Sequence, residues 1–260
     1  MKKISLALLS LTSLGTAAMA NNGFYLGASA GVANTYAKYD NQTINPTSSA
    51  ATFTPEQYAR HTKADAGKPQ GLFGLFAGFG SLVGSGVYFG GEIFGGVDTT
   101  KLNPFDDSAT GSRIGVWKTD LKRNHYYGLA ARLGFMMTPN TMAYLRLAAE
   151  AGKWRSTVTP NAATVDHNAS SSATPEQISA SKAVVNKNKN SIQFAPGAGI
   201  EVHINKNMFV RAEYSYLFGP KLNLAHTTTA LNPSLGLGTG VNHNLKTTQH
   251  AVKVGLGYKF

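Results

Sequence analysis

The sequence has no cysteine among its 260 residues, which excludes disulfide bonds, thiolate nucleophiles and cysteine-ligated metal sites. Acidic residues are scarce, with 13 Asp and Glu against 24 Lys and Arg. No run of about 18 apolar residues follows Ala20, so we expect no membrane-spanning helix. The other structure that satisfies its backbone hydrogen bonds in lipid is a closed β-barrel. The chain is therefore expected to be either a soluble periplasmic protein or a closed barrel.

The start of the chain has the features of an export signal. Lys2 and Lys3 form a basic start, and residues 4–14 form a short apolar segment. Ala18 and Ala20 supply the small side chains that a signal peptidase requires. We predict a signal peptide at residues 1–20 and one mature domain at residues 21–260.

After this signal, segments rich in glycine, aromatic and aliphatic residues alternate with long polar stretches. These segments predict an all-β fold with eight antiparallel strands. The expected strands lie near residues 23–33, 71–80, 87–98, 124–135, 142–154, 191–204, 208–218 and 249–260.

The connections between these strands alternate strictly between long and short. The long ones are residues 34–70, 99–123, 155–190 and 219–248, and the short ones are residues 81–86, 136–141 and 205–207. Long surface loops at one end and tight periplasmic turns at the other are typical of outer-membrane barrels. A soluble sandwich has no reason to sort its loops by length in this way. The pattern therefore favours an up-and-down transmembrane barrel with four long surface loops and three short periplasmic turns.

Alternate residues of each expected strand divide into an apolar face and a face of small residues with isolated charges. In the fourth strand, Leu129 and Phe135 share the apolar face, while Arg132 lies on the other. Small side chains suit the interior of a narrow barrel, so we expect the apolar face to meet lipid. The inner face carries four acidic and four basic residues. Because a buried charge without a partner is costly, we predict that they form an ion-pair network in the lumen. Such a network would block ion flow. Its members are Glu92, Arg132, Arg146, Glu150, Glu201, Arg211, Glu213 and Lys253.

The two ends of the expected barrel carry a resemblance to a known family. Residues 23–31 read Gly-Phe-Tyr-Leu-Gly-Ala-Ser-Ala-Gly, and residues 252–260 read Val-Lys-Val-Gly-Leu-Gly-Tyr-Lys-Phe. The pattern resembles eight-stranded outer-membrane barrels, which include the transmembrane domain of OmpA-like proteins and bacterial surface antigens of similar size. The resemblance implies that the barrel-assembly machinery reads an apolar signal at the C-terminus, namely Val254, Leu256, Tyr258 and Phe260. Unlike OmpA-like proteins, the chain is not expected to carry a peptidoglycan-binding domain, which argues against a role in cell-wall anchoring.

Candidate chemistry is weak. The seven histidines show no metal-ligand spacing, and glycine-rich residues 71–91 lack the helix that a phosphate loop opens. Lipid A deacylases among small barrels are expected to hold His and Ser two residues apart on one strand face, and no His-x-Ser occurs here. We therefore expect no catalytic residues, no cofactor and no metal.

Positive charge is concentrated in the predicted loops. Without Lys2 and Lys3, the chain has 22 basic and 13 acidic residues, net +9, and the loops supply 15 of the bases against 8 acids. Suitable partners are outer-membrane lipid, lipopolysaccharide phosphates and anionic host-cell surface molecules, whereas nucleic acid is not expected outside a cell. A simpler interpretation is that basic loops hold the barrel within its own anionic leaflet.

Three functions remain open on this basis. The favoured one is an outer-membrane surface protein of a Gram-negative bacterium, with a structural or interaction role in adhesion, host contact or envelope integrity. The second is a small porin or ion channel, if the inner charges line water. The third, and least favoured, is a lipid hydrolase or acyltransferase in the membrane.

Overall fold

The computed structural model describes residues 23–44, 61–84, 86–106, 117–160, 184–228 and 239–260. The predicted signal peptide at residues 1–20 lies outside these ranges and stays an expectation. In the part of the chain that is described, no helix is long and apolar enough to cross a membrane.

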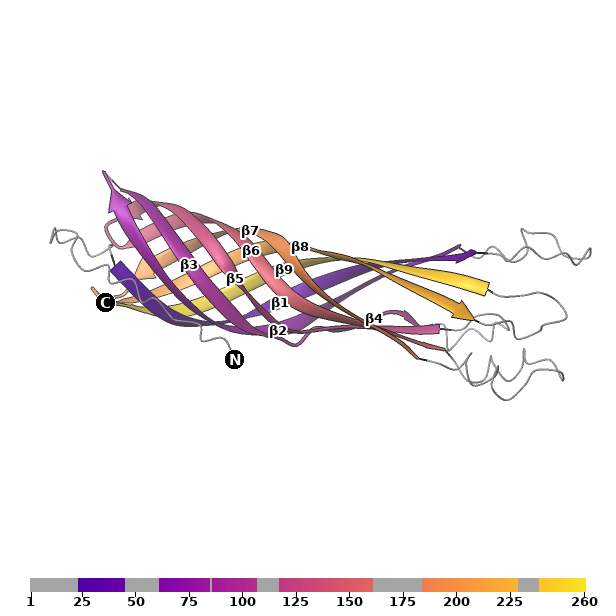
Figure 1. Cartoon of the computed structure of the whole chain (residues 1–260). Coiled ribbons are helices and arrows are strands. Elements are labelled where there is room, and N and C mark those ends of the chain that lie inside the picture. The colour runs from indigo at the N-terminus through magenta and orange to yellow at the C-terminus, as the bar shows by residue number, and fades with distance from the viewer. Residues whose placement is uncertain (1–22, 45–60, 85, 107–116, 161–183, 229–238) are drawn as a thin grey trace, which may run out of the picture.

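Antiparallel strands form one continuous wall (Figure 1). Their bounds are β1 Gly23–Ile44, β2 His61–Val83, β3 Val87–Asp98, β4 Lys101–Asp106, β5 Trp117–Thr138, β6 Thr141–Pro160, β7 Val185–His203, β8 Met208–Thr228 and β9 Thr239–Lys259. The hydrogen-bonded order is β3-β2-β1-β9-β8-β7-β6-β5-β4, and β3 also pairs with β5. Because β4 continues β3 along the wall, the ring has eight strand positions. The predicted eight-stranded antiparallel barrel is confirmed.

Tight turns join the strands at the end of the barrel that holds the C-terminus (Figure 1). Residues 84–86 join β2 to β3, residues 139–140 join β5 to β6, and residues 204–207 join β7 to β8. In the first of these turns, Gly84 and Gly86 have φ angles of 60° and 128°, a backbone conformation that other residues rarely adopt. The three short connections therefore lie where the sequence predicts them.

The four predicted long loops are largely wrong in their described parts. The strands continue past the predicted ends and project from the barrel as long ribbons (Figure 1). We call this region the outer extension, and it comprises residues 34–44, 61–70, 99–106, 117–125, 153–160, 185–190, 219–228 and 239–250. The loop residues between these ranges lie outside the described part of the chain.

A reversal of polarity along the strands explains the error. We call the rest of the barrel, between the tight turns and the outer extension, the membrane part. On β1 its outward residues are apolar, including Phe24 and Val32, whereas further along the strand the outward Lys38 is exposed. The inward residues change in the opposite direction, since Ala37 and Tyr39 are buried. Residues 34–40 therefore alternate like a strand of a soluble barrel. Because their outward residues are polar, a prediction that looks for lipid-facing apolar residues takes this segment for a loop.

The outer extension has an apolar core of its own. Large side chains from six of its strands are almost fully buried, namely Tyr39, Leu102, Leu121, Trp154, Val158, Leu222 and Leu245. In the membrane part, large apolar side chains are exposed on the outside, including Leu75, Ile93, Leu129, Leu147 and Val254. The predicted lipid-facing apolar surface is thus present, and it ends where the extension begins.

Candidate functional site

Glu92 on β3 lies at the centre of the charged interior. Its Oε2 lies 2.5 Å from Nη1 of Arg211, and its Oε1 lies 3.6 Å from Nε of Arg146. The hydroxyl of Tyr25 donates to the same carboxylate at 3.3 Å. The guanidinium carbon of Arg211 lies 3.4 Å from the centre of the Phe76 ring, so Arg211 contacts both a carboxylate and an aromatic face. These groups are buried, and ion pairing offsets their desolvation.

A second carboxylate, Glu213 on β8, continues the network. Lys253 Nζ lies 3.0 Å from its Oε1, and Arg146 Nε lies 3.6 Å from its Oε2. The hydroxyl of Tyr144 donates to Oε2 at 3.2 Å. Arg146 therefore connects Glu92 with Glu213 and joins β3, β6 and β8.

The third carboxylate is Glu201 on β7, whose Oε2 lies 2.6 Å from Nη2 of Arg132. Nη1 of Arg132 donates to the Tyr25 hydroxyl at 3.3 Å, which links this pair to Glu92. The Arg132 guanidinium carbon lies 4.0 Å from the centre of the Tyr144 ring. Seven of the eight predicted network residues thus form one connected cluster.

The eighth, Glu150, belongs to a separate layer nearer the outer extension. Its ion-pair partner is Arg123, which also lies 3.3 Å from Asp98 Oδ2 and donates to Gln249 Oε1 at 3.0 Å. Gln249 donates through Nε2 to Asp98 Oδ2 at 3.0 Å and to Thr35 Oγ1 at 2.9 Å. We call Asp98, Arg123, Glu150 and Gln249 the upper layer.

Sequence reasoning missed Arg123 because it placed this residue in the predicted loop at residues 99–123, and a β-bulge would have hidden its inward direction even on a strand. Strict alternation from Arg132 would place Arg123 on the outer face of β5. The register shifts between Arg123 and Tyr126, with an extra residue inserted opposite β6, and this turns Arg123 inward. Asn124 and His125 are adjacent polar residues, and both are exposed. Two successive polar residues at this point of the strand are the sequence signal that could have indicated the bulge.

Between the two layers lies a cavity of about 10 Å³, bordered by Arg123, Glu150, Gln249 and Lys253 among others. A cavity of that size holds about one water molecule. Side chains therefore fill the interior at this level.

The outside of the extension is strongly cationic. In the extension as a whole, twelve described bases are exposed; Lys68, Lys187 and Lys189 pair with buried residues of neighbouring strands and so have inner-face positions, which leaves nine bases outside against three acids (Asp40, Asp65 and Asp120), a net charge of +6. The bases are Lys38, Lys63, Lys68, Lys101, Lys118, Lys122, Lys153, Arg155, Lys187, Lys189, Lys221 and Lys246. The positive charge predicted for loops is thus carried in part by strands, which fix the spacing between charges.

Six of these bases form two rows that run across the strands. In the first row, Lys246 on β9 pairs with Lys38 on β1 and with Lys221 on β8. In the second, Lys122 on β5 pairs with Lys101 on β4 and with Arg155 on β6. Four steps around the ring separate β9 from β5, so the two cationic rows, as we call them, lie on opposite walls.

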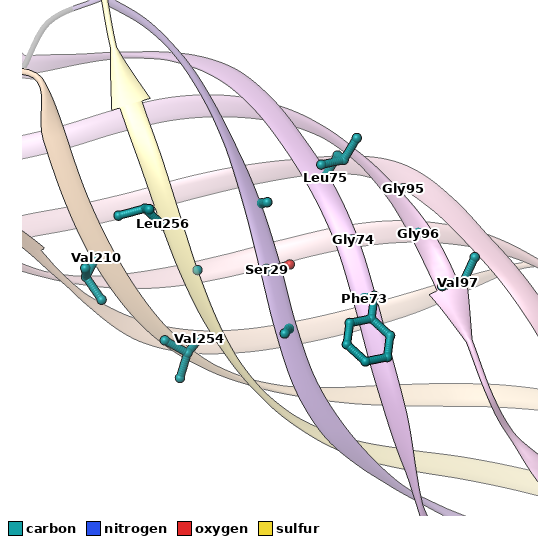
Figure 2. A pocket seen from close by; sticks show the side chains of 13 residues that line it. Ser29, Phe73, Gly74, Leu75, Gly95, Gly96, Val97, Val210, Val254 and Leu256 are labelled. Carbon is teal, nitrogen blue, oxygen red and sulfur yellow. The ribbon is translucent and has the colours of Figure 1, made fainter.

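A wide recess of about 1120 Å³ lies on the lipid-facing wall across β8, β9, β1, β2 and β3 (Figure 2). The exposed apolar side chains around it are Phe73, Leu75, Val97, Val254 and Leu256. Small residues occupy neighbouring inward positions, namely Ser29, Gly74, Gly96 and Gly255. Because the lining is almost wholly apolar, the recess suits the acyl chains of the membrane.

The residues predicted as an assembly signal lie on the outside of the barrel, three on β9 and Phe260 directly after it. Val254, Leu256, Tyr258 and Phe260 are each about half exposed or more. Within the described ranges, no group of three His, Asp or Glu side chains is placed to hold a metal ion.

Residues 4–260 match the family model of the outer membrane protein beta-barrel domain. The chain belongs to this family. As a member, it is an outer-membrane protein of a Gram-negative bacterium. No curated protein matches this chain.

Solved structures similar to this outer-membrane barrel are distant in sequence. Ail, the attachment invasion locus protein of Yersinia pestis, is 14% identical, with 92% of this chain and 99% of that chain covered and a TM-score of 0.39. Neisserial surface protein A is 12% identical, with 92% and 97% covered and a TM-score of 0.38. The outer membrane protease OmpT from Escherichia coli is 10% identical, with 94% and 99% covered and a TM-score of 0.37.

Proposed function

We propose that this outer-membrane barrel is a surface interaction protein that binds anionic polymers through the outside of its extension. The observation that supports this most directly is the pair of cationic rows. Like charges placed directly opposite each other on neighbouring strands destabilise a sheet. Each row contains two such pairs. This arrangement becomes favourable once a polyanion supplies the missing negative charge.

The second row, on β4, β5 and β6, is the stronger candidate. The first row ends beside an acid, because Lys38 pairs with Asp65 on β2. The second row ends at Arg155, whose Nε donates to Asn188 Oδ1 at 3.1 Å. That hydrogen bond orients the guanidinium and leaves its other N–H groups for a ligand.

Strand spacing sets the ligand class. Neighbouring strands lie about 4.8 Å apart, so the three charges of a row span about 10 Å. A chain with closely repeated sulfate, carboxylate or phosphate groups can lie across the strands and contact all three. Anionic glycans on a host cell and the polysaccharide of lipopolysaccharide both have this chemistry, which suits roles in adhesion, host contact or envelope integrity.

The channel alternative is less well supported. The charged interior is paired, and the cavity of about 10 Å³ between its two layers is too small for a hydrated ion. The third alternative, a lipid hydrolase or acyltransferase, has no His-x-Ser pair in the sequence to support it.

Binding of refolded protein to immobilised dextran sulfate, with neutral dextran as the reference surface, tests the proposed function. We expect retention on dextran sulfate that falls with added salt. The variant Lys122→Ala with Arg155→Ala should weaken it about tenfold or more, since each charged hydrogen bond contributes about 1.5–3 kcal/mol. The control is Lys206→Ala, an exposed lysine in the turn at the opposite end. Equal retention of the double variant and the control would overturn the proposal.

A further inference from the structure

A second recess, of about 370 Å³, lies on the outside of β5, β6 and β7. Its outward-facing lining residues are His125, Tyr127, Ala151, Lys153, Asn190 and Ile192. It lies on other strands than the apolar recess described above. It also differs in its lining, which combines polar and apolar groups. We call it the border pocket.

The polar side of the border pocket is built by the β-bulge. The bulge sets Asn124 and His125 opposite Lys153 on β6, and Lys153 pairs in turn with Asn190 on β7. All four side chains are exposed. An ammonium, an imidazole and an amide therefore lie side by side, and side chains of neighbouring strands at such positions are about 5 Å apart. These are groups that donate hydrogen bonds to a phosphate oxygen.

The apolar side lies one step nearer the membrane. Tyr127 pairs with Ala151, and Ala151 pairs with Ile192. Tyr127 and Ile192 are 62% and 79% exposed, so they stand on either side of the small Ala151 side chain. The result is an apolar slot wide enough for a hydrocarbon chain, open to the lipid.

The position along β6 fixes the environment of this pocket. Outward residues Leu145 and Leu147 are apolar and exposed, and the outward positions after Ala151 are Lys153 and Arg155. The pocket therefore lies at the border between the hydrocarbon of the outer leaflet and its polar surface. Its apolar slot faces the hydrocarbon, and its cationic side faces the headgroups.

We propose that the border pocket binds a phosphate-bearing lipid of the outer leaflet, with the phosphate at Lys153 and His125 and an acyl chain over Ala151. In that leaflet the matching ligand is the phosphorylated lipid anchor of lipopolysaccharide. The proposal rests on the outer-membrane location and adds a lipid site to the proposed polymer-binding function. Arg155, the member of the second cationic row nearest the pocket, lies two residues beyond Lys153 on the side away from the membrane. The row then contacts further anionic groups of the same lipopolysaccharide molecule.

The test measures binding of a purified short-chain lipopolysaccharide to refolded protein in neutral detergent micelles. Lys153→Ala should weaken binding about tenfold, in line with the loss of one charge-assisted hydrogen bond. Ala151→Trp, which fills the apolar slot, should weaken it by a similar factor. Lys206→Ala is the control with unchanged binding. Heat-dependent gel mobility confirms that each variant is folded.

Two further probes separate the lipid from its phosphate. With the same lipid after enzymatic removal of its phosphates, Lys153→Ala should bind as wild type does, while Ala151→Trp should still bind more weakly. With inorganic phosphate alone, neither variant should differ from wild type. Equal lipopolysaccharide binding by wild type and both variants would overturn the proposal, and so would an effect of Lys153→Ala on free phosphate as large as that on the lipid. A wild-type protein that binds the lipid but is not retained on dextran sulfate would contradict the proposed function and leave this site standing.

Discussion

Arg123 Nη1 lies 3.3 Å from Asp98 Oδ2, at the level where the inside of the barrel changes from charged to apolar. Below this pair, towards the periplasmic turns, the buried inner residues include the carboxylates and guanidinium groups of the ion-pair network. Beyond it the buried residues are uncharged and mostly apolar, and Leu121 and Trp154 are fully buried. The pair thus separates a membrane barrel with a polar interior from an extension with a core of soluble type.

The first prediction concerns this junction. Arg123→Met leaves two carboxylates, Asp98 and Glu150, buried without their cation. Removing one partner of a buried pair costs about 3–5 kcal/mol, so the free energy of unfolding should fall by that amount. Urea unfolding in lipid vesicles, followed by tryptophan fluorescence, measures the change.

A triple variant supplies the control for the junction. Asp98→Asn, Arg123→Met and Glu150→Gln together remove the cation and both anions, so no buried charge is left unpaired. We expect the triple variant to lose much less stability than Arg123→Met alone, because the penalty of a broken pair comes from the charge that remains. A triple variant as unstable as the single one would contradict the assigned pairing.

The junction also separates what the sequence predicts from what it does not. Strands in the membrane part are predictable because lipid imposes apolar residues at alternate positions, as Leu129 and Phe135 illustrate. Beyond the junction no such constraint acts on the outer face. Lys118 and Lys122 are as compatible with a loop as with a strand, and the buried Leu121 between them is a weak signal by itself.

The partners of the inner charges were harder to predict than their inward direction. Parity along a strand gives the face of each residue, and it places Glu150 and Arg146 on the inner face together. Their partners depend on contacts across the lumen between strands distant in the ring, such as Glu92 on β3 with Arg211 on β8. Alternation within one strand contains no information about such contacts.

The second prediction concerns conductance. Purified, refolded protein in a planar bilayer should show no steady openings, because paired side chains fill the lumen in two layers. Removing the pairs in both layers, with Arg123→Ala and Glu150→Ala in one and Arg132→Ala and Glu201→Ala in the other, should produce measurable current. These substitutions remove two cations and two anions, so the net charge of the lumen does not change and current reflects the opened space. Steady openings in the wild type would establish the channel function instead.

The third prediction concerns the core of the outer extension. Leu121 is fully buried there, and replacement of a buried leucine by alanine costs about 2–5 kcal/mol. Since the extension has its own core, Leu121→Ala should loosen it while the membrane part stays folded. Limited proteolysis of vesicles should cut the extension of the variant faster and leave a protected membrane fragment.

Lys122→Ala is the matched control for that experiment, because Lys122 is the exposed neighbour on the same strand. Its digestion rate should equal that of the wild type. If Leu121→Ala digests no faster than Lys122→Ala, the extension does not depend on an apolar core.

The fourth prediction concerns the end of β9 and separates folding from assembly. Phe260 is 75% exposed, and its ring lies 5.2 Å from that of Tyr258, so it buries little surface in the folded barrel. Replacing Phe260 by Ala should therefore leave refolding in detergent unchanged. If the residue is read by the assembly machinery, the same variant should reach the outer membrane of cells in much smaller amounts. Phe24→Ala is the control, because Phe24 is a 59% exposed aromatic at the same end whose carbonyl accepts a hydrogen bond from the Phe260 backbone. Equal membrane levels of the two variants would show that the terminal aromatic acts only as part of the lipid-facing surface.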